Sequence, residues 1–250
     1  MEGTCTAEEM EARKFGSFTT QSGRVLPDFG EKHIIDWGPE RVFADLKKGG
    51  RDVPTLYVGI DPHPVRPWAI ALMAQYYDGR TVAFAEWPDS RYPAFHRIDS
   101  MFKSVAEYCK IIKELARGFP VYQYRADKRS AFGNDADRVH CLREMLKDES
   151  KRRIMLLPQE GNEDACVRSM TLALKSEPPT FFVHKDCRNT RRGMETWCLE
   201  ERGGKMLEVK ERYSGKGQER QKCFPNAVGF VVGSNPQWTP PEKWLYERPR

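Results

Sequence analysis

The stretch Thr55-Leu-Tyr-Val-Gly-Ile-Asp61, followed by Pro62, decides the fold of this chain. It is a short apolar run that stops at an acid and a proline, which is the pattern of a strand buried in a sheet. A second apolar run, residues 68–77, is separated from a third, residues 80–87, by the turn pair Asp78-Gly79. Asp-Gly between two apolar runs indicates a hairpin. The three runs therefore predict an antiparallel meander at the start of the core.

After the meander, helix and strand patterns alternate. Apolar side chains recur at three- and four-residue steps in 100–118, 135–148 and 163–175, which predicts three helices. Short apolar runs at 120–127 and 153–158 predict the strands between them. Strand–helix–strand units with short links imply parallel pairing with right-handed crossovers. The predicted fold class is therefore α/β, a mixed sheet of a three-strand antiparallel meander plus parallel strands, flanked by helices.

The last part of the chain carries shorter patterns. We expect a strand at 181–184, a helix at 189–200, a hairpin arm at 205–213 and a closing helix at 224–233. Residues 214–222 are polar, basic and glycine-containing, which favours a mobile loop.

Composition narrows the class of protein. The 250 residues include 41 Lys and Arg against 36 Asp and Glu, for a formal net charge of +5, with 39% hydrophobic and 31% charged residues. This length fits one large domain or two small ones, and the balance excludes disordered and collagen-like chains. The apolar runs are too short for a bilayer, and residues 1–14 lack the apolar core of a signal peptide. The seven cysteines are scattered without zinc-ligand spacing, which favours reduced thiols in a cytosolic setting.

Two predicted strands end in an acid, Asp61 and Asp127. Ligands of open α/β sheets bind beyond the carboxyl ends of the strands, and these two carboxylates would meet there if their strands are neighbours. Carboxylates held close together repel unless one is protonated or a cation lies between them. Oxygen ligands suit Mg²⁺ or Mn²⁺, and such ions serve in-line attack on a phosphodiester. The alternative is that both acids are only turn or helix-cap residues.

These acids also carry a resemblance to a known family. Tyr57-Val-Gly-Ile-Asp61-Pro resembles the first metal-binding strand of the nuclease in the large terminase subunit of tailed phages, and Tyr122-Gln-Tyr-Arg-Ala-Asp127 resembles its second acidic strand. Asp186-Cys-Arg-Asn-Thr190 and the late hairpin are placed as in that family. Upstream segments resemble the stretch that joins its ATPase and nuclease halves: residues 7–15, Gly16-Ser-Phe, Ser22-Gly-Arg-Val-Leu-Pro-Asp-Phe29 and His33-Ile-Ile. The collinear order of these short motifs carries the resemblance.

The resemblance implies an RNase H-like fold and an endonuclease that cuts concatemeric double-stranded viral DNA with Mg²⁺ or Mn²⁺, through two ions. It also implies an ATPase domain, a portal and a small terminase subunit as partners, and a place in the host cytoplasm during viral assembly. No G-x-x-x-x-G-K-[ST] motif is present, so we expect a nuclease domain without its ATPase half. We expect residues 1–50 to be a lead-in that wraps the core, 51–234 to be the nuclease domain with a hairpin insertion at about 200–222, and 235–250 to be a tail.

The chain departs from the family at the third ligand. The family closes its site with Asp-His-x-x-Asp-Ala on the last helix, where this chain has Lys222-Cys-Phe-Pro-Asn226-Ala. We assign Asn226 to the third catalytic and metal-binding position, because an amide oxygen can ligate a hard cation although it adds no negative charge. Four explanations stay open: an engineered Asp→Asn change, a natural variant that uses Glu219 or another acid, a nuclease that has lost activity, or a shifted alignment.

Basic residues near the predicted site are candidate DNA contacts. Lys128 and Arg129 follow Asp127 directly, and further cations precede the closing helix: Lys216, Arg220 and Lys222. Phosphate contacts of this kind position DNA without reading its sequence. The alternative is an ordinary solvated surface.

Two other functions remain open from the sequence. One is another RNase H-like enzyme, such as a junction resolvase or a transposase-type strand transferase, which branched rather than linear DNA would reveal. The other is a DNA- or portal-binding domain without cleavage, which Lys222 and Asn226 favour.

Overall fold

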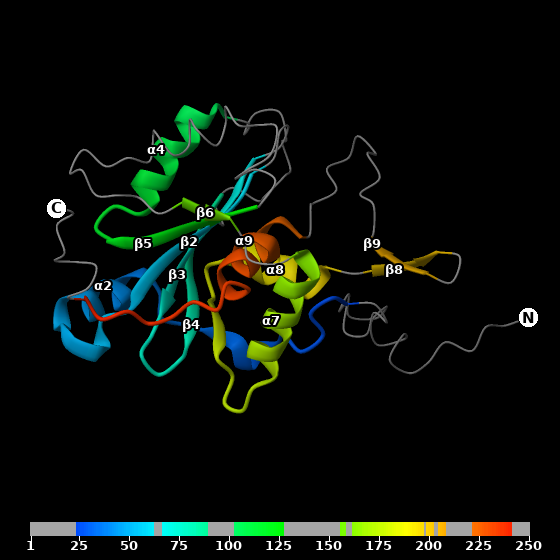
Figure 1. The fold of residues 1–250 in the computed structure, drawn as a ribbon, viewed down its shortest axis with the longest axis horizontal. Helices are drawn as coiled ribbons and strands as arrows, with labels where there is room; N and C mark the ends of the chain where they lie inside the picture. The colour runs from blue at the N-terminus through cyan, green and yellow to red at the C-terminus, as the bar shows by residue number, and fades with distance from the viewer. Residues whose placement is uncertain are drawn as a thin grey trace, which may run out of the picture.

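The computed structural model describes residues 24–62, 67–89, 103–127, 156–158, 162–197, 199–202, 205–208 and 222–241. Its centre is a seven-stranded sheet in the order β1-β7-β4-β3-β2-β5-β6, and a separate two-stranded hairpin pairs β8 with β9. Figure 1 shows helices on both faces of the large sheet and the hairpin extending away from them. The predicted mixed α/β sheet is therefore confirmed.

The meander forms the middle of the sheet. Strands β2 (Thr55–Asp61), β3 (Ala69–Gln75) and β4 (Thr81–Trp87) pair antiparallel in sequence. Nearly every side chain of these strands is buried, because helices cover the sheet on both faces. The predicted strand at 55–61 has the same bounds as β2, and the predicted meander is confirmed.

The remaining strands of the sheet pair in parallel. On one side of the meander, β5 (Val121–Ala126) pairs with β2, and β6 (Leu156–Pro158) pairs with β5. On the other side, β7 (Phe181–His184) pairs with β4, and β1 (Ile34–Ile35) pairs with β7. The carboxyl ends of β2, β4, β5 and β7 consequently lie at one edge of the sheet, which is the edge where the sequence predicts the site.

One face of the sheet is covered by α2 (Pro39–Lys48) and α4 (Val105–Leu115). The N-cap Ser104 accepts a hydrogen bond from the Glu107 amide, and the Glu107 carboxylate accepts one from the Ser104 amide, so a capping box starts α4. Apolar residues of both helices pack on alternate strand residues in the larger core: Val42, Leu56, Val58, Ile60, Ile70, Leu72, Phe84, Tyr108 and Ile112.

The opposite face is covered by α7 (Glu163–Lys175), α8 (Arg188–Thr196) and α9 (Cys223–Val232) (Figure 1). The side chain of Asn162 caps α7 by accepting from the Ala165 amide. The core under these helices joins strand residues that alternate with the first set to apolar helix residues. The strand residues are Tyr57, Ala71, Met73 and Ala83, and the helix residues are Met170, Leu174, Met194, Val228 and Val231.

Two parts of the structure differ from the expectations, and two predicted segments fall outside the described residues. The predicted helix 189–200 ends at Thr196, because Trp197 is buried in the core, and Leu199–Arg202 forms β8 against β9 (Lys205–Glu208). Residues 31–52, where no element is predicted, contain the short helices η1 (Glu31–His33) and η2 (Gly50–Asp52) as well as β1 and α2. The predicted helix 135–148 and loop 214–221 lie outside the described residues.

The segment after α9 returns along the sheet and bonds to the start of β2. The Tyr57 hydroxyl donates to the Gln237 carbonyl at 2.8 Å, and the Trp238 indole donates to the Val53 carbonyl at 2.8 Å. The Thr239 amide donates to the Thr55 hydroxyl at 2.7 Å. Among the helices that the structure describes, none has the length and apolar content that crossing a membrane requires.

Candidate metal centre

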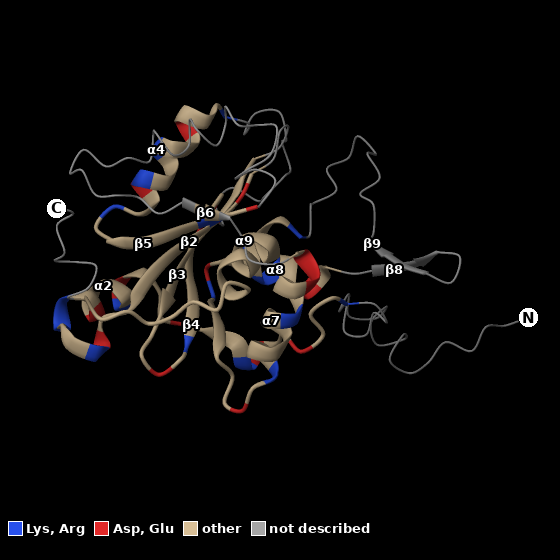
Figure 2. Ribbon diagram, viewed as in Figure 1, with Lys and Arg blue, Asp and Glu red and all other residues tan. Residues whose placement is uncertain are grey.

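Asp61 and Asp127 lie at the ends of neighbouring parallel strands. The register pairs Ile60 of β2 with Ala126 of β5, so each aspartate is the residue directly after a paired residue. Asp61 is 7% exposed and Asp127 is half-buried. Figure 2 shows acidic positions where β2 and β5 end. The two predicted ligands are therefore brought together at one edge of the sheet.

Both aspartates belong to the face that α9 covers. Side chains alternate along a strand, and Tyr57 of β2 packs in the core beneath α9, so Gly59 and Asp61 share that face. On β5, Tyr124 and Ala126 pack on the opposite face, which puts Asp127 on the α9 side.

Helix α9 approaches β2 unusually closely. A Cβ atom at Gly59 would lie 2.7 Å from the carbonyl carbon of Ala227 and closer still to its oxygen. Ala69, the β3 partner of Asp61, packs with Cys223, Phe224 and Ala227 in the first turns of the helix. The beginning of α9 therefore lies next to the end of β2.

Asn226, the third predicted ligand, is in this part of α9. It precedes Ala227, its amide donates to the Lys222 carbonyl at 2.8 Å, and it is half-buried. Lys222 is the residue before α9, and its ammonium group pairs with the Glu163 carboxylate of α7 at 3.4 Å. The ion pair links the starts of α7 and α9 beside the aspartates.

Sequence reasoning missed Arg125. It is in register with Gly59, is 8% exposed and shares the face of Asp127 two residues later. Its buried positive charge therefore belongs to the same face of the sheet as Asp61 and Asp127. The sequence signal that could have identified Arg125 is its position two residues before Asp127, in the strand that leads to this predicted ligand.

Glu86 lies at the same edge, at the end of β4, and the structure decides its role. It is 4% exposed and accepts hydrogen bonds from the amides of Asn189 and Thr190, at 2.8 and 2.9 Å, and from the Thr190 hydroxyl at 2.7 Å. Burial raises the pKa of Glu86 to about 7, although these hydrogen bonds oppose the shift. Glu86 thus holds the first turn of α8 against the sheet and is fully engaged there.

The donor set fits a hard divalent cation. Two carboxylates on adjacent strands and one amide oxygen on the neighbouring helix are the oxygen ligands that Mg²⁺ and Mn²⁺ prefer. Within the described part of the chain, no group of three or more His, Cys, Asp or Glu side chains is arranged to hold a metal ion. With Asn226 as the third ligand, the candidate centre carries one carboxylate fewer than the family pattern.

Most of the predicted DNA contacts lie outside the described residues. This applies to Lys128, Arg129, Lys216 and Arg220. Lys222 is described, and its ammonium group faces Glu163.

Solved structures share this architecture, whereas no family model and no curated protein matches the chain. The large terminase of a thermophilic bacteriophage aligns with a TM-score of 0.61 at 14% identity, over 92% of this chain and 52% of that one. The P22 large terminase nuclease domain aligns with a TM-score of 0.55 at 10% identity, over 86% and 93%. The large terminase nuclease of a second thermophilic phage, G20c, solved with bound cobalt, aligns with a TM-score of 0.51 at 10% identity, over 85% and 98%.

The chain spans about half the length of the first of these large terminases and nearly all of the P22 and G20c nuclease domains. At these identities the likeness concerns the fold. The chain therefore has the fold of the nuclease domains of phage large terminases, as the resemblance predicted.

Proposed function

We propose that this chain, with its terminase-nuclease fold, is a DNA endonuclease that hydrolyses phosphodiester bonds with divalent cations held by Asp61 and Asp127. One observation carries the proposal: the parallel register of β2 and β5 ends both strands in an aspartate, on the face that α9 covers. Two buried or half-buried carboxylates at such an edge are stable together when a cation neutralises them.

Each residue has a separate task in this proposal. Asp61 and Asp127 hold the cation, and Asn226 adds a neutral oxygen from α9. A bound divalent cation would stabilise the charge that develops on the phosphate and would favour deprotonation of the attacking water. Arg125, two residues before Asp127 on β5, adds a buried positive charge on the same face of the sheet.

The third ligand affects how tightly the ions are held. The family resemblance implies two ions, and we propose two here, of which the second binds more weakly because Asn226 carries no negative charge. We also propose that residues 51–234 form the functional nuclease domain, between a lead-in at 1–50 and a tail at 235–250.

The wider role is packaging of viral DNA. A large terminase of about twice this length shares the fold, so we propose that the domain works beside an ATPase domain, on concatemeric double-stranded DNA, in the host cytoplasm. Portal and small-subunit partners belong to the same proposal.

Plasmid nicking in Mn²⁺ tests the activity. We expect the chain to nick supercoiled DNA, Asp61→Ala and Asp127→Ala to reduce nicking to background, and Asn226→Asp to raise it. Glu40→Ala, which removes an exposed carboxylate on α2, is the matched control and should act as wild type. Activity that survives Asp61→Ala would defeat the assignment.

Metal binding gives a second measurement that does not depend on turnover. Mn²⁺ titration followed by electron paramagnetic resonance should show binding to wild type and to Glu40→Ala, and none to the Asp61→Ala, Asp127→Ala double variant. Asn226→Asp should strengthen the weaker binding event.

A second candidate function is DNA or portal binding without cleavage. The neutral Asn226 favours it, as does the lack of a three-acid group within the described residues. Saturable binding of duplex DNA without nicking, in wild type and in Asn226→Asp alike, would select this function. Preferred cleavage of branched over linear DNA would instead select a junction resolvase.

A further inference from the structure

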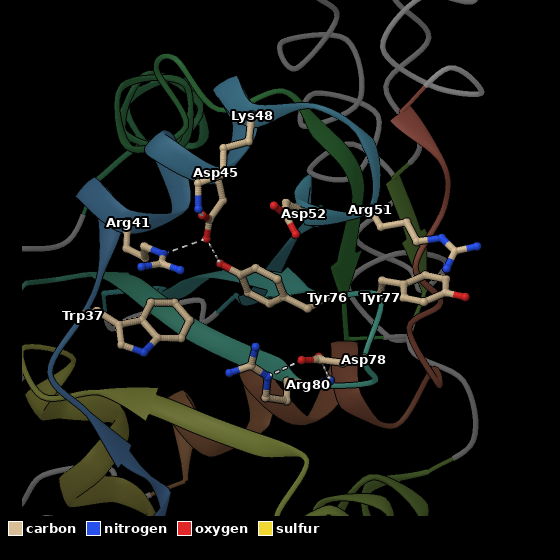
Figure 3. Close-up of a pocket in the computed structure, with 10 residues that line it drawn as sticks. All are labelled: Trp37, Arg41, Asp45, Lys48, Arg51, Asp52, Tyr76, Tyr77, Asp78 and Arg80. Atoms are coloured by element: carbon tan, nitrogen blue, oxygen red, sulfur yellow. Dashed lines mark hydrogen bonds and ion pairs between the residues drawn. The ribbon is translucent and has the colours of Figure 1, made fainter.

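A polar pocket lies at the edge of the sheet opposite the candidate metal centre. It has a volume of about 320 Å³ and is formed by α2, η2 and the turn between β3 and β4 (Figure 3). Asp61 pairs with Ala69 at the start of β3, whereas Tyr76 of the pocket follows the end of β3. At about 3.3 Å per residue, the pocket is therefore about 20 Å from the candidate metal centre.

Buried Asp45 organises one wall of this pocket. Its carboxylate accepts hydrogen bonds from Arg41 Nε at 3.1 Å, from Lys48 Nζ at 2.7 Å and from the Tyr76 hydroxyl at 3.2 Å. Burial opposes ionisation of Asp45, but the bonds from Lys48 and Arg41 outweigh it and hold its pKa below the ordinary value. Asp45 is therefore ionised, and its negative charge is paired with Arg41 and Lys48.

Arg80, which lies on a different part of the pocket lining, is also positioned by an aspartate. Its Nε donates to the Asp78 carboxylate at 2.6 Å, and its guanidinium carbon lies 5.5 Å from the centre of the Tyr76 ring. Arg41 and Arg80 therefore each donate a hydrogen bond from Nε to an aspartate. Their terminal guanidinium nitrogens point away from these aspartates. Figure 3 shows the two guanidinium groups turned toward the space beside Trp37 and Tyr76.

Aromatic rings supply the remaining wall. Trp37 and Tyr76 meet edge to face with their ring centres 5.9 Å apart, and Tyr77 carries Arg51 over its ring at 4.5 Å. Two of the acids in the lining, Asp45 and Asp78, already bind Arg41 and Arg80. The charged lining consists of four basic and three acidic side chains: Arg41, Lys48, Arg51 and Arg80, and Asp45, Asp52 and Asp78.

We propose that this pocket binds a phosphate group, carried by a nucleotide or by a nucleic acid strand. Guanidinium groups oriented through Nε present their terminal nitrogens as a planar pair of donors, which matches the oxygens of a phosphate. The site is separate from Asp61 and Asp127, so phosphate binding in the pocket can be tested independently of DNA cleavage.

Nuclear magnetic resonance titration of the full chain with inorganic phosphate tests the site. The reporter is the Trp37 indole N–H signal, assigned by its loss in Trp37→Phe. We expect saturable shifts of that signal, with affinity about tenfold lower in Arg80→Gln and in Arg41→Gln, since a charge-assisted hydrogen bond is lost. Arg80 is 45% exposed on its side chain, so its variant should fold even if the Arg41 variant does not.

Controls separate the pocket from general charge effects. Arg117→Gln removes a cation that is 77% exposed just after α4, outside the pocket, and should bind phosphate as wild type does. Asp61→Ala should also bind phosphate normally, even if it abolishes cleavage. The proposal is overturned if phosphate shifts no Trp37 signal, or if Arg80→Gln and Arg117→Gln bind it equally well.

Competition identifies the source of the phosphate. Displacement of inorganic phosphate by a 5′-deoxynucleotide, but not by duplex DNA, would assign a free nucleotide. Displacement by duplex DNA that weakens in Arg80→Gln would assign the backbone of a nucleic acid.

Discussion

The backbone of Gly59 lies against the carbonyl group of Ala227, with no room between them for a side chain. This contact joins β2 to α9 two residues before Asp61 and one residue after Asn226. The candidate metal centre therefore depends on a glycine that takes no part in its chemistry.

Replacing Gly59 with alanine should destabilise the protein by about 3 kcal/mol, because the added methyl group meets backbone atoms that cannot move aside independently. Urea unfolding measures the effect. Gly30→Ala is the matched control, since a Cβ atom there has no neighbour within 4 Å. Equal stability of the two variants would contradict the contact.

Replacing His33 with leucine should cost about 2 kcal/mol, because one buried and one partly buried hydrogen bond are lost. Nδ1 of His33 accepts from the Gly30 amide at 3.1 Å, and Nε2 donates to the Leu174 carbonyl at 2.9 Å, which ties η1 to the end of α7. Lys32→Ala, at a neighbouring exposed position, should change the free energy of unfolding little. A His33→Leu variant as stable as Lys32→Ala would refute the link.

Glu86 should make stability fall as the pH rises. Its folded pKa of about 7 exceeds the ordinary value of 4.5, so the folded state binds the extra proton between these values. The contribution is favourable below about pH 4.5 and is lost as the pH rises through 7, with a total of about 3 kcal/mol. Burial raises the pKa of the neighbouring Cys187 thiol, so that group stays protonated throughout.

Chemical unfolding at pH 5 and pH 8 checks this prediction against Glu86→Gln. The stability difference between wild type and the variant should shift in favour of the variant at pH 8. A difference that is the same at both pH values would show that Glu86 is ionised throughout.

Replacing Trp238 with phenylalanine should cost about 1 kcal/mol, because the indole donor to the Val53 carbonyl is lost while much of the ring remains. Gln237→Ala is the control, since it is the backbone carbonyl of Gln237 that binds Tyr57. Thermal unfolding that ranks the two variants in the opposite order would argue against attachment of this segment to β2.

Much of the fold was predictable from local pattern. The strands at 55–61 and 181–184 and the helix at 163–175 have the predicted bounds, because each is an apolar run or an amphipathic repeat between turn or cap residues. β1 and α2 were not predicted, since the repeated glycines and prolines around them mask short elements whose stability comes from packing.

The sequence by itself determined the meander, the strands β5 and β7 and the two acids at the ends of β2 and β5, because residue alternation and strand termination depend on neighbouring residues. Only the tertiary structure decided that Glu86 caps α8, that Gly59 seats α9 beside Asp61 and that Asp45 gathers Arg41, Lys48 and Tyr76. Except for the helical pairs within α2, these contacts join residues tens to more than a hundred positions apart. Sequence periodicity does not predict these contacts, because they depend on how helices and strands that are far apart in the sequence pack together.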